Sequence, residues 1–524
     1  MSDVPEFPDR FNMASYFVDA NVEAGRGSKV AIHYEGSQLT YQQVFENVNR
    51  AGNGLKALGL QPEQRVLTVL HDRPEFVYFW FGAIKVGGVA TQINPLLPTE
   101  DFAYYLNYTK APIAAVDEEA LEKFLPALKE ARYLKHVIVV GKSDAAGAPD
   151  GITVHAWDEW LKGQSEKLNP ADTSKDDPSV WLFTSGTTGH SKGAVHFHSH
   201  FAYNTEVYAK RFIGMRESDI TVSGPRLFFG YATGTNVMFP FAVGATTVLF
   251  PDRPTPARLF ELVGKHKCTV LTNVPTLINK MLSDDARPDL SSLRFMWSAG
   301  EALPKDLHDK WDAAFGVPII DGIGSAESFH IYISNRPGDV RPGSLGKLVP
   351  GYTARLTDDD GNAVQQGDVG TLWVGGDSAA LYYHNAYAKS KEHLRGGWIV
   401  SGDKFRQDAD GYWFYEGRGD DLIKSGGIYV SPLEVENCLM QHEAVKECCV
   451  IGKKDDAGLE KPFAIVVLNE GVEASDATSD RLIAHAKKKL VRYKAPHGVA
   501  FSDKPLPRND RDKIDRKALR KEYA

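Results

Sequence analysis

The chain has 524 residues, of which 43% are hydrophobic and 24% are charged, with 60 Lys and Arg against 68 Asp and Glu. These proportions are typical of a globular protein and exclude a disordered, collagen-like or disulfide-stapled chain. At about 100 to 200 residues per domain, the length predicts two to four domains, each large enough to bury its own core.

The sequence has neither the pattern of an export signal nor that of a membrane span. The first ten residues are acidic and interrupted by proline. The longest apolar stretch, from Val237 to Phe250, is shorter than the ~20 residues of a spanning helix, and Pro240 and Gly244 interrupt it. We therefore expect a cytoplasmic protein with no membrane partner, whose four cysteines are reduced and mostly buried.

Hydrophobic periodicity predicts an α/β architecture over most of the chain. Apolar residues recur at helical spacing from 39 to 58, behind Thr40, which can cap a helix. Short apolar runs between helix-like segments predict buried strands at 65–70, 137–140, 180–183, 246–250, 268–271 and 294–297. This alternation predicts layered α/β subdomains with largely parallel sheets.

The pattern changes after residue 343. Between 343 and 415, short β-like pieces alternate with turn signals such as Asp360-Gly361-Asn362 and Asp410-Gly411. We predict a mainly β subdomain there, which completes a large domain of residues 1–419.

Residues 420–524 are predicted to form a small α+β domain. Its expected elements are strands near 447–451 and 464–468 and a helix near 480–490. The end of the chain is basic, since residues 485–524 contain 13 Lys and Arg but only 5 Asp and Glu. No nucleic-acid-reading motif accompanies this charge, so we expect a solvated face that favours a phosphorylated ligand, and no nucleic-acid partner.

The most informative segment follows the predicted strand at 180–183. It contains three glycines, five hydroxyl side chains and one lysine, in the order Thr184-Ser185-Gly186-Thr187-Thr188-Gly189-His190-Ser191-Lys192-Gly193. Glycines let the backbone approach an anion, hydroxyls donate to phosphate oxygens, and Lys192 adds positive charge. A P-loop would need glycine directly before the lysine, where this chain has Ser191.

This segment resembles the phosphate-binding signature of the acyl-adenylate-forming superfamily, which includes acyl- and aryl-CoA synthetases, adenylation domains and luciferases. In that family the loop closes over the β- and γ-phosphates of ATP. The resemblance implies that the loop residues bind ATP, namely Thr184, Ser185, Gly186, Thr187, Thr188 and Gly189, and that Lys192 is catalytic.

Two more motifs follow in the order of that family. Gly300-Glu301-Ala302 comes after a predicted strand and resembles the loop beside the adenine. Asp403, in Ser401-Gly402-Asp403, resembles the aspartate that accepts hydrogen bonds from the ribose hydroxyls. Arg418 is at a position that implies contact with the ribose or a phosphate.

The segment from Asp321 to Glu327 resembles the one that binds the metal and the α-phosphate. Its glutamate holds Mg²⁺ in the family, as suits a hard cation that also bridges phosphates, which implies a catalytic, metal-binding role for Glu327. A preceding hydroxyl contacts the α-phosphate, and Ser325 can supply it. The chain departs from the family at Ile323, where an aromatic ring is usual, and at Ala326, where threonine is usual. The resemblance also implies nucleotide contacts for Asp321 and Gly322.

The C-terminal motifs imply a domain that changes position during the reaction. Asp420 falls at the hinge of the family, so residues 420–524 are expected to be mobile. Lys513 falls at the position of the catalytic lysine, although Asp512 replaces the usual preceding glycine. Rotation about the hinge withdraws that lysine and opens a tunnel for coenzyme A, here expected along Ser425, Gly426 and Gly427.

Family position also indicates the acyl pocket. Its expected residues are Phe229, Gly230, Tyr231, Ala299, Gly324 and His330. Aromatic walls with glycines between them suit a short, flat ring better than a long alkyl chain. The chain resembles the benzoate-CoA and 4-hydroxybenzoate-CoA ligase branch, in which a ring nitrogen of His330 could bond a phenolic hydroxyl; a buried structural histidine is the alternative. His196, His198 and His200 alternate in a strand-like stretch and are expected to be structural.

The sequence therefore predicts an AMP-forming aryl-CoA ligase that uses ATP, Mg²⁺ and coenzyme A and acts on a small aromatic acid as a monomer or homodimer. Three alternatives stay open. They are a stand-alone adenylation enzyme that loads a carrier protein, a luciferase-like oxidase, and an ATP-binding regulator without catalysis, the last favoured by the departures at Ile323, Ala326 and Asp512.

Overall fold

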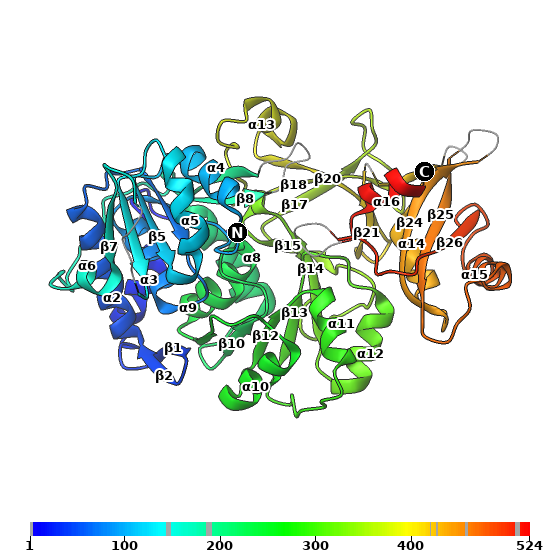
Figure 1. The fold of residues 1–524 in the computed structure, drawn as a ribbon, viewed down its shortest axis with the longest axis horizontal. Helices are drawn as coiled ribbons and strands as arrows, with labels where there is room; N and C mark the ends of the chain where they lie inside the picture. Colours follow the sequence, from blue (N-terminus) through cyan, green and yellow to red (C-terminus); the bar gives the residue numbers. More distant parts are fainter. Residues whose placement is uncertain are drawn as a thin grey trace.

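The computed structural model of the chain describes residues 4–142, 148–184, 191–419, 421–425, 428–455, 460–508 and 514–523. It is a mixed α/β structure with a large N-terminal part and a smaller C-terminal part (Figure 1). Three sheets build the large part, and the C-terminus lies in the smaller one.

A seven-stranded sheet holds the strand that leads into the predicted phosphate loop. Its strands, in spatial order, are β7 (Thr153–Ala156), β6 (His136–Val140), β5 (Ile113–Asp117), β3 (Arg65–Val69), β4 (Val89–Gln92), β8 (Pro178–Thr184) and β9 (Lys192–Phe197). Its helices are α2 (Tyr41–Ala57), α3 (Pro74–Lys85), α4 (Thr99–Thr109), α5 (Leu121–Ala127) and α6 (Trp157–Leu161). All pairs are parallel except the last, in which β8 and β9 run antiparallel and place Thr184 opposite Lys192.

Helix α2 confirms the prediction from local sequence. The Thr40 side chain accepts a hydrogen bond from the Gln43 backbone, and the Gln43 side chain accepts one from the Thr40 backbone. The apolar face of this helix, including Val44, Val48 and Leu55, is fully buried.

A nine-stranded sheet carries the other predicted motifs. Its strands, in spatial order, are β16 (Lys347–Leu348), β15 (Ile331–Ser334), β14 (Ile319–Gly324), β13 (Phe295–Ser298), β12 (Val270–Asn273), β10 (Ile220–Ser223), β11 (Thr246–Leu249), β1 (Val30–Tyr34) and β2 (Ser37–Thr40). The helices of this region are α1 (Ala20–Glu23), α8 (Gly230–Thr233), α9 (Phe239–Val243), α10 (Pro256–His266), α11 (Pro275–Ser283) and α12 (Lys305–Phe315), whereas α7 (His198–Asn204) contacts β8 and β9 of the seven-stranded sheet. The strands from β14 to β1 are parallel, as predicted.

Two local predictions differ from the structure. The strand expected at 268–271 begins only at Val270, because Lys267 ends α10 in a left-handed conformation and the Cys268 N–H still bonds to the carbonyl of Val263. The strand-like stretch expected through His200 ends at Phe197, and α7 begins at His198. The three alternating histidines therefore do not lie on one strand.

The hydrophobic core of the large part is continuous between its sheets. One buried cluster contains side chains from α2, α3, β13, β15 and β18 (Gly370–Gly375), among many others. The apolar stretch from Val237 to Phe250 belongs to these cores, as expected. Over the described ranges, no helix combines the length and apolar character needed to cross a membrane. All four cysteines are buried and free.

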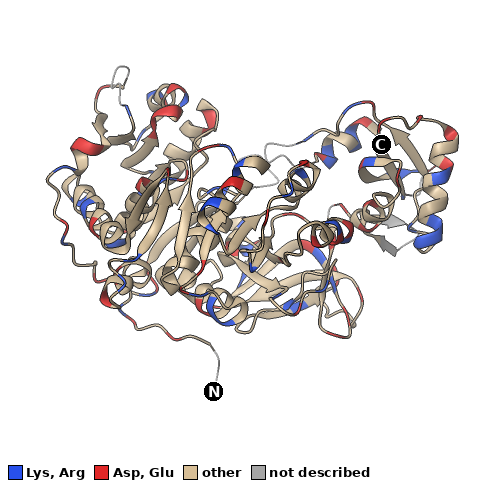
Figure 2. Ribbon diagram, turned by 90° about the horizontal axis from the view of Figure 1, so that it is seen from below, with Lys and Arg blue, Asp and Glu red and all other residues tan. Residues whose placement is uncertain are grey.

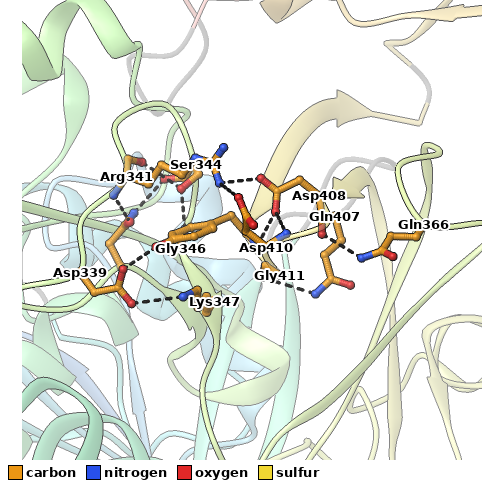
Figure 3. Close-up of polar contacts among 12 residues, drawn as sticks. Asp339, Arg341, Ser344, Gly346, Lys347, Gln366, Gln407, Asp408, Asp410 and Gly411 are labelled. Atoms are coloured by element: carbon orange, nitrogen blue, oxygen red, sulfur yellow. Dashed lines mark hydrogen bonds and ion pairs between the residues drawn. The ribbon is translucent and has the colours of Figure 1, made fainter.

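A five-stranded antiparallel sheet occupies residues 353–418. Its strands are β17 (Thr353–Thr357), β18 (Gly370–Gly375), β19 (Leu394–Arg395), β20 (Trp398–Gln407) and β21 (Trp413–Arg418), with α13 (Tyr387–His393) beside them. Figure 3 shows the polar network that joins its β20–β21 turn to the segment before β16. There, an Nη1 of Arg341 lies 2.7 Å from Asp408 and 3.3 Å from Asp410, and Lys347 pairs with Asp339 at 3.4 Å.

The smaller part contains two further sheets. Its strands are β22 (Ile423–Ser425), β23 (Ile428–Val430), β24 (Val445–Lys454), β25 (Glu460–Leu468) and β26 (Gly498–Phe501). Its helices are α14 (Pro432–Leu439), α15 (Asp476–Lys489) and α16 (Arg516–Tyr523). Lys and Arg lie along the helices of this part (Figure 2), and α15 ends on three consecutive lysines. The domain boundary at 419/420 stays a prediction, because residue 420 lies outside the described residues.

Candidate active site

A cleft of about 610 Å³ separates the nine-stranded sheet and the β20–β21 pair from the smaller part. It brings together seven of the predicted nucleotide or acyl residues, namely Gly300, Glu301, Ala302, Gly322, Gly324, Asp403 and Arg418. The smaller part contributes side chains that sequence reasoning did not single out, including Asn437, Arg508 and Arg516. The cleft therefore has walls from segments more than 200 residues apart.

The Gly300 loop forms one wall. It follows β13 directly, and Gly300 has φ +84°, a conformation that favours glycine. One carboxylate oxygen of Glu301 accepts hydrogen bonds from the Thr276 N–H (3.1 Å) and hydroxyl (2.7 Å) at the start of α11. Glu301 thus fixes the loop through its side chain and leaves the backbone of 300–302 at the cleft.

Asp321 lies behind the cleft wall, on β14. Its backbone carbonyl accepts hydrogen bonds from the Asn335 backbone (2.9 Å) and side chain (3.2 Å). Its side chain is buried, and Oδ1 has no hydrogen-bond partner among the described residues. Burial raises the pKa of this carboxyl to about 8. An unsatisfied buried acceptor of this kind is suited to a donor brought by a ligand.

Asp403 faces the cleft from β20. It stands opposite Arg418 in the β20–β21 ladder, with 3.6 Å between Arg418 Nε and Asp403 Oδ1. The Tyr415 hydroxyl lies 3.5 Å from the same oxygen, and the Asp403 N–H donates to Ser401 Oγ at 2.8 Å. A carboxylate placed in this way can accept hydrogen bonds from two vicinal hydroxyls.

Glu327 and Lys192 both contact the side chain of Tyr383. Glu327 lies in a short 3₁₀ turn after β14, and its Oε1 accepts a hydrogen bond of 2.6 Å from the Tyr383 hydroxyl. Lys192 begins β9, and its Nζ lies 4.6 Å from the centre of the Tyr383 ring. Burial lowers the pKa of Lys192, and the charge of Glu327 opposes that shift. Sequence reasoning missed Tyr383, since no spacing links it to a residue 56 positions earlier.

A strained residue separates Glu327 from His330. Phe329 has φ +70° and ψ −56°, the geometry of a tight γ-turn that non-glycine residues rarely adopt. Its ring is buried, 3.8 Å from that of Phe201 between centroids. The turn allows Glu327 to face β9 while His330 lies against Tyr231.

The structure brings His330 and Tyr231 together. His330 Nε2 lies 3.0 Å from the Tyr231 carbonyl oxygen, so Nε2 carries the proton and Nδ1 is an acceptor. Nδ1 is buried without a partner in the part of the chain that the structure describes. Burial lowers the pKa of His330 to about 3, which keeps the ring neutral. The Tyr231 hydroxyl donates to the Asn273 carbonyl at 3.3 Å.

The other expected acyl-pocket residues lie in different surroundings. Ala299 is buried in the core. Phe229 is 46% exposed and packs on Phe228, with ring centroids 4.6 Å apart. A Cβ on Gly230 would lie 3.0 Å from a Leu182 methyl group, and one on Gly324 would lie 2.3 Å from the His330 carbonyl oxygen. The two glycines are thus explained by close packing.

The histidines after the loop are buried in contacts within the fold. His196 Nε2 lies 2.7 Å from the Ala326 carbonyl oxygen, which supports the turn that carries Glu327. His198 Nδ1 accepts from the Met13 N–H at 3.0 Å. These contacts agree with a structural role.

Several predicted residues lie outside the described residues. They are Ser185, Gly186, Thr187, Thr188, Gly189, Asp420, Gly426, Gly427 and Lys513. Ser425 ends β22, and Ile514, directly after Lys513, lines the cleft. Arg516 also lines the cleft and lies 2.5 Å from Glu436 Oε1.

Comparison with known proteins identifies close relatives over the whole chain. Family models described as AMP-binding enzyme and AMP-binding enzyme C-terminal domain match residues 18–384 and 434–513. The chain is 42% identical to a benzoate–CoA ligase of Thauera aromatica, over 98% of this chain and 97% of that protein. It is 37% identical to a 4-hydroxybenzoate–CoA/benzoate–CoA ligase of Rhodopseudomonas palustris, over 97% and 94%. The crystal structure of the anthranilate CoA ligase AuaEII with anthranoyl-AMP matches with a TM-score of 0.91 and 37% identity, over 98% of both chains.

Proposed function

Because this chain belongs to the AMP-binding, acyl-adenylate-forming enzyme family, we propose that it is an aryl-CoA ligase. It would activate a benzoate-type acid with ATP and transfer the acyl group to coenzyme A, with AMP and pyrophosphate as the other products. The observation that carries the proposal is the 42% identity to a benzoate–CoA ligase over nearly the full length of both chains.

The first half-reaction joins the acid to AMP. A carboxylate oxygen attacks the α-phosphorus of ATP, and the bond from that phosphorus to the bridging oxygen breaks as pyrophosphate leaves. Negative charge grows on phosphoryl oxygens, so the catalytic demand is for positioned donors and cations. Thr184, the loop that follows it and Lys192 would hold the pyrophosphate, and Lys513 would lie near the attacking oxygen.

The nucleotide would bind in the cleft. The backbone of 300–302 lies there for the adenine, and the unsatisfied Asp321 Oδ1 can accept a hydrogen bond from the amino group of the base. Asp403 can take the ribose hydroxyls, and Arg418 lies beside it. Ser325 would supply the hydroxyl toward the α-phosphate, since Ala326 has none.

Glu327 fits a magnesium ion. Mg²⁺ in phosphoryl-transfer sites typically takes one or two carboxylates and completes its shell with water and phosphate oxygens. The Tyr383 hydrogen bond engages Oε1 of Glu327, and no other described residue is hydrogen-bonded to Oε2. When bound, the ion would neutralise charge that develops on the phosphates.

The second half-reaction requires a rearrangement. The sulfur of coenzyme A attacks the acyl carbonyl, the bond to the AMP oxygen breaks, and AMP leaves. Lys513 would obstruct that carbonyl if it stayed in place, so residues 420–524 would rotate about Asp420. The same rotation would bring Ser425, Gly426 and Gly427 beside the pantetheine chain.

His330 would contribute to the choice of acid. Its Nδ1 is a neutral acceptor inside an aromatic cluster that includes Tyr231, Phe239 and Tyr208. An acceptor favours a ring that carries a hydroxyl or amino donor. We expect His330→Leu to lower kcat/KM for such acids about tenfold more than for benzoate, because one buried hydrogen bond is lost; an equal loss for all acids would contradict the assignment.

The function is tested by ATP–pyrophosphate exchange with a panel of benzoates, followed by addition of coenzyme A. Exchange that depends on an aromatic acid, and an aryl thioester identified by mass, are the expected results. Exchange without a thioester would favour loading of a carrier protein. No exchange with any acid would favour the regulator and overturn the proposal.

A further inference from the structure

The segment Ser378–His384, here called the strap, joins the two halves of the phosphate and metal region. On one side it lies against β9. The Val195 N–H donates to the Tyr382 carbonyl at 3.0 Å, the Leu381 N–H to the Val195 carbonyl at 3.1 Å, and the His384 N–H to the Gly193 carbonyl at 2.9 Å. The strap is therefore fixed to the strand that begins with Lys192.

On the other side the strap holds the turn that carries Glu327. The Ala380 N–H donates to the Glu327 carbonyl at 2.6 Å, and the Ser378 hydroxyl donates to the Ser328 carbonyl at 2.9 Å. The Tyr383 hydroxyl reaches the Glu327 carboxylate itself. The Ala380 N–H and the Ser378 hydroxyl thus position the turn, and the Tyr383 side chain positions the carboxylate.

Tyr383 is the residue at which both sides meet. It is 4% exposed, and its ring lies under the Lys192 ammonium. Its hydroxyl donates to Glu327 Oε1 at 2.6 Å. A hydroxyl bonded to one carboxylate oxygen restricts rotation of the group and fixes the direction of the second oxygen.

We propose that Tyr383 is a positioning residue for adenylation, which holds the Glu327 carboxylate and the Lys192 ammonium in one fixed arrangement. This inference rests on the proposed function. Its effect is confined to the half-reaction in which pyrophosphate leaves, because both of its partners act there. The transfer of the acyl group to coenzyme A does not depend on it.

Tyr383→Phe tests the hydrogen bond without removing the ring. We expect the Mg²⁺ concentration for half-maximal, acid-dependent exchange to rise about tenfold or more, since a hydrogen bond to a charged group is lost. The KM for benzoate and the rate of thioester formation from supplied benzoyl-AMP should stay within about twofold of the wild type. Mn²⁺ binding in the presence of ATP, measured by electron paramagnetic resonance, should weaken in parallel.

Tyr382→Phe is the matched control. This neighbour lies on the same strap, is 38% exposed and contacts β9 through its backbone, so its variant should retain the wild-type Mg²⁺ requirement. In a Glu327→Gln background, Tyr383→Phe should add little further loss, because the two changes remove the same interaction.

The outcomes separate the inference from the function. If the wild type exchanges pyrophosphate but Tyr383→Phe and Tyr382→Phe share its Mg²⁺ dependence and Mn²⁺ affinity, the inference is overturned and the function stands. Fully additive losses in the Glu327→Gln background would also overturn it. If the wild type shows no exchange with any aromatic acid, the proposed function fails, and the inference fails with it.

Discussion

The interface between the five-stranded and nine-stranded sheets differs from the interface between the large part and the smaller part. Where the five-stranded sheet meets the nine-stranded one, Leu345, Tyr352, Phe405 and Trp413 belong to the same buried cluster as the main core. The Leu345 N–H and the Trp413 carbonyl are hydrogen-bonded at 2.8 Å, and the Arg341 network closes the edge (Figure 3). This junction is built like a domain interior.

The junction with the smaller part is built like a surface. A cleft of about 610 Å³ and a second cavity of about 320 Å³ lie along it. Within the described ranges, the two hydrophobic clusters of the smaller part contain only side chains from 423 to 523. Separate cores with cavities along their boundary are what a body needs to change position without unfolding. The contrast supports a fixed frame for the nucleotide and a movable body that carries Lys513.

The substitution with the largest expected effect removes the lysine that the movable body is proposed to carry into the active site. Lys513→Ala should slow acid-dependent exchange by about 10²- to 10³-fold, the usual loss for one charge-stabilising donor. Thioester formation from supplied benzoyl-AMP should hardly change, because Lys513 has withdrawn by then. Equal losses in both assays would contradict the alternating arrangement.

Arg516→Met tests whether the smaller part is stabilised by a core of its own, separate from that of the large part. The Arg516 guanidinium is 2.5 Å from Glu436 Oε1 and 3.8 Å from Asp421 Oδ2, and it also donates to the Val450 carbonyl. Removing one partner of such a buried pair should lower the free energy of unfolding of this body by about 3 kcal/mol. Denaturant unfolding followed by hydrogen exchange should locate the loss in the elements after residue 421, and a loss spread over the large part would contradict separate cores.

Asp420→Pro tests the link between the two bodies. Proline fixes one backbone angle and removes an N–H, so a segment that must rotate loses freedom. We expect the thioester-forming step to slow several-fold more than the adenylation step. Rapid-quench measurement of the two steps distinguishes this result from a uniform decrease, which would indicate general damage.

Arg341→Ala probes the fixed junction and should have the smallest effect. Arg341 is partly exposed, so loss of its ion pairs should cost at most about 1 kcal/mol of stability. Thermal unfolding should show a small decrease, and the ratio of the two half-reaction rates should stay unchanged. A selective change in either half-reaction would show that this junction also moves.

The helix and strand boundaries that depend on residues close together in the chain could be predicted from the sequence. Thr40 and Gln43 define the start of α2, and the short apolar runs gave strands β3, β6, β11 and β13 within one or two residues. Motif order placed the Gly300 loop, Asp403 and Arg418 at one cleft.

Contacts set by long-range packing could not be predicted from the sequence. The Tyr383–Glu327 hydrogen bond joins two residues that are 56 positions apart and lie outside the strands, and the proton position on His330 follows from a carbonyl 99 residues earlier. The partial exposure of Phe229 also depends on long-range packing, and its role in the acyl pocket stays a prediction. Helix α7 begins at His198, so the strand-like alternation of His196, His198 and His200 continues past the end of β9.

The most direct test of the account is a crystal structure with a nonhydrolysable mimic of benzoyl-AMP. We predict the adenine beside residues 300–302, with its amino group toward the Asp321 carboxyl, and both ribose hydroxyls on Asp403. A mimic bound elsewhere, with Asp403 and Asp321 making no contact to it, would contradict the assignment of the cleft.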